Sequence, residues 1–156
     1  MQSSSCRASF PLASKLAFAG SRHGSPYPVQ PVVAAVLNSG GSIRVGCASG
    51  VDHAVRLAAP SALVFSASFA RFSHLPPASA LAARTVAVVS GATALCIFPP
   101  ASGVLGRGSS LALSTAMRLS IPIWFAGPVS PLGANWSAHS IASVQGWLYY
   151  PQPALF

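Results

Sequence analysis

The sequence predicts a single α/β domain built on a five-stranded, doubly wound parallel sheet with helices on both faces. Five short apolar runs alternate with segments whose apolar residues recur at helical spacing, which is the pattern of a parallel sheet connected through helices. The 156 residues suit one domain, and a hydrophobic fraction of 52% supplies a sizeable core. Because only 6% of the residues are charged, disorder is not expected over most of the chain.

Each strand is expected where an apolar run is bounded by turn residues. The runs lie at 16–19, 42–45, 62–65, 94–98 and 122–125. Between the first two, valines and Leu37 recur at helical spacing, and Asn38 to Gly41 supplies a C-terminal stop. Three further helices are expected at about 51–59, 77–89 and 109–119.

The two ends are expected to lie outside this domain, which spans 15–127. Residues 1–14 are interpreted as a flexible tail, and 128–156 as an irregular aromatic arm that packs on the domain or on a partner subunit. Aromatic side chains of the arm either stack nucleic-acid bases or pack against protein. They are Trp136, Trp147, Tyr149, Tyr150 and Phe156. Because the helix at 77–89 is apolar nearly all round, a homo-oligomer is predicted.

Asp52 is the only acidic side chain in a chain with nine basic ones and a net charge of +8. Hydrolysis by paired carboxylates needs two such groups, and a magnesium or calcium site needs several oxygen ligands. One aspartate therefore supports neither within this chain. The excess positive charge favours polyanionic partners such as nucleotides or nucleic acid.

Three glycine-rich turns follow predicted strands and are candidate anion-binding loops. They are 20–22, 46–52 and 103–110. Because ligands of open parallel sheets bind outside the carboxyl ends of the strands, the three turns are expected to meet at one edge. Each leads toward a helix N-terminus, where free N–H groups and the helix dipole favour anions. The sequence thus predicts a ligand that carries phosphate.

These turns, together with Ala83-Arg84-Thr85, resemble motifs of the SLOG superfamily of Rossmann-like domains. That group includes the Smf/DprA DNA-processing proteins and the LOG nucleotide phosphoribohydrolases. In DprA-like members the second turn reads approximately S-G-x-A-x-G-I-D, which Gly46 to Asp52 follows closely. An arginine resembling Arg84 lies upstream of the fourth strand in both branches, and a G-x-G-[ST] loop after that strand resembles 106–109. The resemblance covers about residues 15–127 and implies a Rossmann-like nucleotide-binding domain.

The chain departs from the LOG pattern after the last loop. LOG hydrolases carry an acidic residue just after a G-G-x-G-T turn, and it is held to be catalytic, whereas Leu111, Ala112 and Leu113 occupy that region here. The resemblance therefore implies a non-catalytic module, without a cofactor, that binds a nucleotide or nucleotide-derived ligand. The alternatives are a DprA-like protein that binds single-stranded DNA, and a LOG-like phosphoribohydrolase that lacks the usual Glu. The candidate ligand-binding residues are Gly20, Ser21, Arg22, Gly46, Ser49, Gly50, Asp52, Arg84, Gly106, Arg107, Gly108, Ser109 and Ser110.

Several of these residues also have a purely structural interpretation. Asp52 either holds a ligand hydroxyl or amine, or caps the second helix by accepting backbone N–H bonds. Arg22, Arg84 and Arg107 either bind phosphate or are solvated surface charges. Cys47 is either a thiol activated by the helix N-terminus or a small residue that lets the backbone approach phosphate.

Metal binding and membrane insertion are not expected. His23, His74, His139 and the three cysteines lack ligand spacing, and Cys96 is interpreted as a core residue. Prolines and glycines interrupt the long uncharged segments too often for a spanning helix. The first residues contain no apolar signal region, so a cytoplasmic location is predicted.

Overall fold

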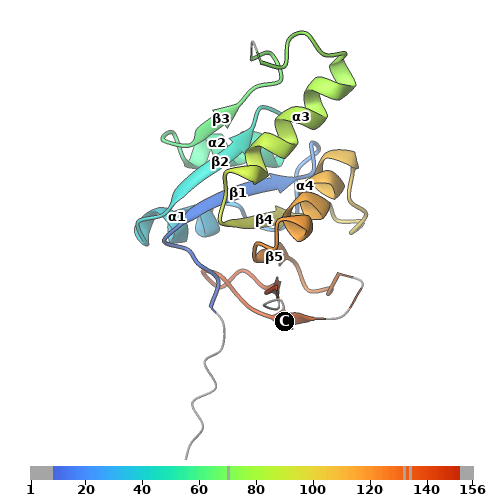
Figure 1. Ribbon diagram of the computed structural model, residues 1–156. Coiled ribbons are helices and arrows are strands. Elements are labelled where there is room, and N and C mark those ends of the chain that lie inside the picture. The colour runs from blue at the N-terminus through green and yellow to red at the C-terminus, as the bar shows by residue number, and fades with distance from the viewer. Residues whose placement is uncertain (1–8, 70, 132, 134, 152–156) are drawn as a thin grey trace, which may run out of the picture.

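Seven strands form one mixed sheet in the order β3-β2-β1-β4-β5-β7-β6, with helices on both faces, in the computed structural model (Figure 1). The structure describes residues 9–69, 71–131, 133 and 135–151. The strands are β1 Lys15–Gly20, β2 Ser42–Gly46, β3 Leu63–Phe65, β4 Ala94–Phe98, β5 Ile123–Ala126, β6 Trp136–Ala138 and β7 Gly146–Tyr149. The helices are α1 Gln30–Asn38, α2 Val51–Ala58, α3 Pro77–Ser90 and α4 Arg107–Arg118.

Successive side chains along each strand point to opposite faces of the sheet, and so they form two cores, one on each face. Leu16 and Phe18 of β1 point into the first core, where they meet buried valines of α1 and α2. Ala17 points into the second core, which holds Val88 and Val89 of α3 and small residues of α4. The chain thus forms three layers, with α1 and α2 on one face and α3 and α4 on the other.

The first five strands are parallel and confirm the predicted α/β class. Their order, 3-2-1-4-5, is that of a doubly wound sheet, and it reverses direction between β1 and β4. Those two central strands pair from Leu16 opposite Ala94 to Gly20 opposite Phe98, so both end at the same edge. This edge carries the turns that lead into the helices.

The prediction of a five-stranded, wholly parallel sheet is wrong. β7 pairs antiparallel with β5, with Ile123 opposite Tyr149, and β6 pairs antiparallel with β7. Both extra strands lie in 128–156, where an irregular arm was expected because prolines and glycines obscure the short alternating runs. Leu148 faces the first core while Tyr149 packs against the second, so β7 covers both sides of an edge that β5 would otherwise expose.

The aromatic side chains of this C-terminal region are engaged with the sheet. The Trp136 ring packs against Phe125 and Tyr149, with ring centroids 6.1 and 5.5 Å away. The buried Trp124 donates from Nε1 to the His139 carbonyl at 2.8 Å. These contacts favour the packing interpretation of Trp136 and Tyr149; Phe156 lies outside the described residues.

The expected N-terminal tail falls mostly outside the described residues, since 1–8 are not among them. Phe10, however, is only 5% exposed and belongs to the first core, and Ser42 donates its N–H to the Ser14 carbonyl at 2.9 Å. Residues 9–14 are therefore joined to the domain. Helix α3 buries one face and leaves Leu81 outward. Within the part of the chain that the structure describes, no helix has the length and apolar character to cross a membrane.

Candidate functional site

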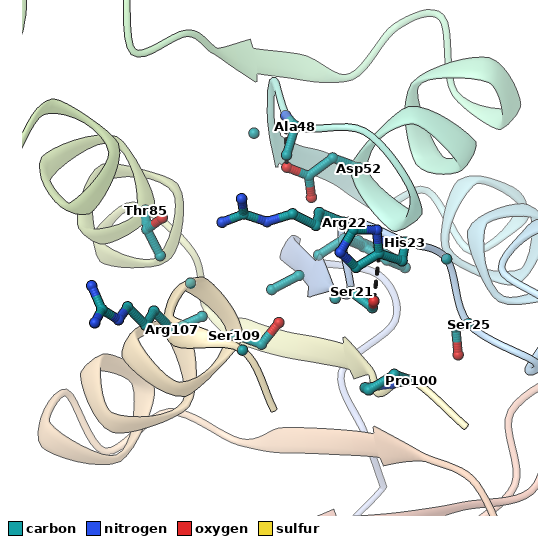
Figure 2. A pocket seen from close by; sticks show the side chains of 18 of the residues that line it. Ser21, Arg22, His23, Ser25, Ala48, Asp52, Thr85, Pro100, Arg107 and Ser109 are labelled. Atoms are coloured by element: carbon teal, nitrogen blue, oxygen red, sulfur yellow. Dashed lines mark hydrogen bonds between the residues drawn. The ribbon is translucent and has the colours of Figure 1, made fainter. Parts of the chain in front are cut away.

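A cavity of about 970 Å³ lies at the carboxyl edge of the sheet, where the strand order reverses between β1 and β4 (Figure 2). The β1–α1 loop, the β2–α2 turn, α3, and the β4–α4 loop with the first turn of α4 form its wall. Ten of the predicted ligand-binding residues line it: Gly20, Ser21, Arg22, Gly46, Asp52, Arg84, Gly106, Arg107, Gly108 and Ser109. The turns that the sequence singled out therefore do meet at one place.

The N-terminus of α4 opens onto this cavity. No side chain caps the helix, and its first turn contains no acidic residue. The first intrahelical bond runs from the Ser110 N–H to the Gly106 carbonyl, so the three preceding N–H groups are left over. A Cβ added to Gly106 or Gly108 would meet no atom within 4 Å, so open space adjoins both residues. An anion could approach these N–H groups closely.

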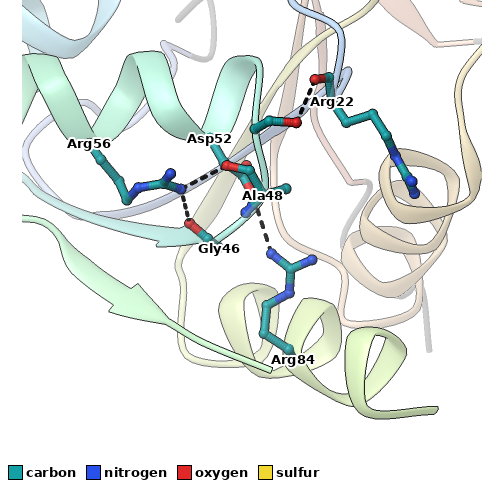
Figure 3. A network of polar contacts seen from close by, with 7 residues as sticks. Arg22, Gly46, Ala48, Asp52, Arg56 and Arg84 are labelled. Atoms are coloured by element: carbon teal, nitrogen blue, oxygen red, sulfur yellow. Dashed lines mark hydrogen bonds and ion pairs between the residues drawn. The ribbon is translucent and has the colours of Figure 1, made fainter. Parts of the chain in front are cut away.

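Asp52 and Arg84 form a buried ion pair beside the cavity (Figure 3). Asp52 Oδ2 accepts from Arg84 Nη1 and from the Ala48 N–H, each at 3.2 Å, and both residues are less than a tenth exposed. The sequence placed these residues on the ligand as two separate contacts, and the structure shows them bonded to each other. Asp52 also does not cap α2, because the N-cap is Gly50 and no side chain bonds there.

Each partner keeps unused hydrogen-bonding capacity. Asp52 Oδ1 has no partner among the described residues, and Figure 2 shows one carboxylate oxygen directed into the cavity. Arg84 Nε is buried with no acceptor among those residues. Burial raises the pKa of the Asp52 carboxyl, and the opposing effects of Arg84 and the Ala48 N–H do not cancel this rise.

Arg56 fixes the glycine-rich turn from the other side and was not selected from the sequence. Its Nη1 donates to the carbonyls of Gly46 and Ala48, each at 2.9 Å (Figure 3). A signal was present, because Arg56 follows Asp52 by four residues and so lies on the same face of α2. Arg56 is a positioning residue, since it does not line the cavity.

Ser49 and Gly50 were predicted to bind the ligand, but neither lines the cavity. They connect the β2–α2 turn with the β1–α1 loop. Ser49 Oγ donates to the Arg22 carbonyl at 2.9 Å, and the Val51 N–H donates to the Ser21 carbonyl at 3.0 Å. Gly50 has a φ of 70°, and a Cβ there would overlap the β1–α1 loop. These residues therefore hold the β1–α1 loop against α2. The remaining candidate, Ser110, is exposed and also lies outside the lining.

Arg22 and Arg107 are the cations free to meet a ligand here. Both are exposed, and neither side chain has a hydrogen-bond or ion-pair partner among the described residues. Figure 2 shows Arg22 extending from the β1–α1 loop, and Arg107 from the start of α4, toward the side of the cavity where Thr85 lies. Ser25, Thr85 and Val104 also line the cavity and were not among the predicted ligand-binding residues, although Thr85 follows Arg84 directly and Val104 lies within the turn at 103–110.

No metal-binding cluster of His, Cys, Asp or Glu occurs in the described part of the chain. Cys47 is a half-buried free thiol, and burial raises the pKa of the core residue Cys96. Comparison of the chain with models of protein families, with curated proteins and with solved structures finds no significant match.

Proposed function

We propose that this chain is a non-catalytic module that binds a nucleotide or a nucleotide-derived phosphate ligand in the cavity at the carboxyl edge. The observation that carries this proposal is the meeting of two unpaired arginines, Arg22 and Arg107, with the uncapped N-terminus of α4. The resemblance of the same loops to the SLOG superfamily supports it. The cavity volume is within the range of small-molecule sites.

The charges favour a phosphate over a neutral ligand. Arg84 and Asp52 offset each other, so Arg22 and Arg107 leave the cavity with an excess of positive charge. Guanidinium groups and free helix N–H groups both bind phosphate oxygens strongly. A ribose hydroxyl or base amine could donate to the unoccupied Asp52 Oδ1.

Catalysis is not part of the proposal. Asp52 is the only acidic side chain of the chain and is held by Arg84, while Leu111, Ala112 and Leu113 stand where LOG hydrolases carry their acid. Incubation with nucleoside monophosphates should therefore release no free base. Release of base that disappears in Asp52→Asn would instead support the phosphoribohydrolase alternative.

The experiment that tests binding uses AMP as the probe and calorimetry as the readout. Arg22→Ala and Arg107→Ala should each weaken AMP binding by roughly 10- to 150-fold, the effect of losing one charge-assisted contact. Arg118→Ala is the matched control, because Arg118 lies at the opposite end of α4 and outside the cavity. Equal losses for all three variants, or none, would contradict the proposal.

Single-stranded DNA is the second candidate, favoured by the net charge of +8. Salt separates it from a mononucleotide, because affinity for single strands falls with a slope of about −0.7 per neutralised phosphate. AMP binding should depend only mildly on salt. A steep salt dependence with an oligonucleotide, together with no binding of AMP, would favour the DNA-binding alternative.

We also propose that the chain self-associates. Leu63 on the edge strand β3 and Leu81 on α3 are both exposed, and covering them at a subunit contact would remove apolar surface from water. Light scattering of the protein over a range of concentrations tests this proposal. A monomer at every concentration would refute it.

A further inference from the structure

A second cavity, of about 630 Å³, adjoins the first on the α1–α2 side of the β1–α1 loop. The two cavities share Gly24 and Ser25, so this loop is the wall between them. Figure 2 shows Ser25 and Arg107 on opposite sides of the first cavity. The second cavity therefore begins at the side remote from the N-terminus of α4.

The lining of the second cavity differs in chemistry from that of the first. It contains no charged side chain and is mostly apolar. Tyr27, Pro28, Ala54 and Leu57 are among its residues. Leu57 is 69% exposed, although Val51 and Val55 of the same helix are buried in the core. Such a surface favours an uncharged, apolar group and not phosphate.

Two features hold this cavity in shape. Ser25 Oγ donates to the Pro99 carbonyl at 2.6 Å, which fixes the shared wall to the end of β4. The Tyr27 ring packs so closely on Gly127 that a Cβ there would overlap it. Gly24 lines both cavities, and a Cβ added to it would meet no atom within 4 Å. A ligand that spanned the two cavities would therefore cross a residue without a side chain.

We propose that the second cavity is a subsite for the planar nucleobase of a ligand whose phosphate occupies the first cavity. This inference rests on the proposed function and adds to it the recognition of the base. The base lies against Tyr27 and Pro28 and covers Leu57, while the phosphate lies near Arg107 and the first turn of α4. An aromatic ring and a leucine are suited to the face of any base, so the subsite distinguishes nucleotides from simple sugar phosphates.

The test compares the affinities of AMP and ribose 5-phosphate, which carries a hydroxyl group in place of the base. The wild-type protein should bind AMP at least tenfold more tightly. Leu57→Ala should weaken AMP binding by roughly 3- to 30-fold, because only part of the leucine becomes covered, and should leave ribose 5-phosphate binding unchanged. Because Leu57 is exposed, this variant should fold as the wild type does.

Leu119→Ala is the matched control, because Leu119 is another exposed leucine and lines neither cavity. It should leave both affinities unchanged. The inference is overturned, with the proposed function intact, if both probes bind equally well or if Leu57→Ala leaves the ratio of affinities unchanged. It is also overturned if Leu57→Ala weakens both probes equally. If neither probe binds, the proposed function fails as well.

Discussion

Arg84 donates to Asp52 across 3.2 Å and thereby joins α3 to the first turn of α2 at the end of β2. The pair includes the only acidic side chain of the chain, so it settles where the one negative side-chain charge lies. The pair has a structural role beside the cavity. Asp52 orients the glycine-rich turn by accepting from the Ala48 N–H, and it holds the Arg84 guanidinium in place. A ligand that entered the cavity would therefore meet an arranged pair and not two independent side chains.

Breaking this pair should destabilise the fold. Asp52→Ala leaves a buried guanidinium without its partner, and we expect the free energy of unfolding to fall by about 3 kcal/mol. Arg84→Ala should have a similar effect, and the double variant should lose less than the sum, with a coupling of about 0.5–3 kcal/mol. Urea unfolding of the four proteins measures this coupling. Strict additivity would show that the two side chains do not interact.

The pH dependence of stability should carry the signature of Asp52. Its pKa is raised by burial above the ordinary value of 3.8, so the folded state holds the proton up to a higher pH than the unfolded state does. The contribution of Asp52 is therefore fully present below pH 3.8 and is lost as the pH rises through the raised folded value. Above that value it is constant.

The measurement is the difference in unfolding free energy between wild type and Asp52→Asn across this pH range. Taking the difference removes the contributions of other groups. One of these is His139, whose pKa is lowered by burial and whose effect has the opposite sign, with stability rising up to pH 6.5. A difference that does not change with pH, or that moves in favour of the wild type as the pH rises, would contradict a raised pKa for Asp52.

Much of the parallel sheet could be predicted because its signals are local. The apolar runs at 16–19 and 94–98 coincide closely with β1 and β4, and Asn38 to Gly41 ends α1 as expected. The antiparallel pairs of β7 could not be predicted, because three- and four-residue strands carry little alternation and their pairing is set by distant residues. Leu148, for example, is buried where β7 lies between β5 and β6.

The meeting of the three turns at one edge of the sheet could be predicted from the sequence, but the contacts between their side chains could not. Rules on strand ends and glycine-rich turns indicated where a ligand would meet the chain. They said nothing of which side chains bond to one another, so Asp52 and Arg84, 32 positions apart, were treated separately. Ser49 was likewise given to the ligand, whereas its hydroxyl bonds to the Arg22 carbonyl. Such pairings depend on the angle between packed elements, which a sequence pattern does not contain.

Gly46→Ala should disturb the ion pair more than any other single methyl group at the site. A Cβ at this position would overlap Arg84 Nη1 and would lie 2.7 Å from Asp52 Oδ2, so the guanidinium must move. We expect a loss of unfolding free energy of about 1–3 kcal/mol, as for overpacking of a core. Gly106→Ala is the control, because open space surrounds its Cβ position. Similar stabilities of the two variants would contradict the packing described around Gly46.

The N-terminus of α4 allows stability and binding to be separated. Gly108→Ala places a methyl group in open space within the first turn of the helix, where alanine favours helix formation by up to about 1 kcal/mol over glycine. We therefore expect a slightly higher melting temperature. The same methyl group projects from a residue that lines the cavity and should hinder the approach of phosphate to the free N–H groups.

AMP binding by Gly108→Ala should accordingly be weaker by roughly tenfold, the effect of losing about one hydrogen bond to a charged group. Ser110→Ala changes the same turn at an exposed position outside the cavity, and it should leave AMP affinity unchanged. Calorimetry for binding and thermal unfolding for stability, applied to both variants, separate the two effects. If Gly108→Ala raised the melting temperature and bound AMP as the wild type does, the phosphate would have to lie elsewhere in the cavity, away from the N-terminus of α4.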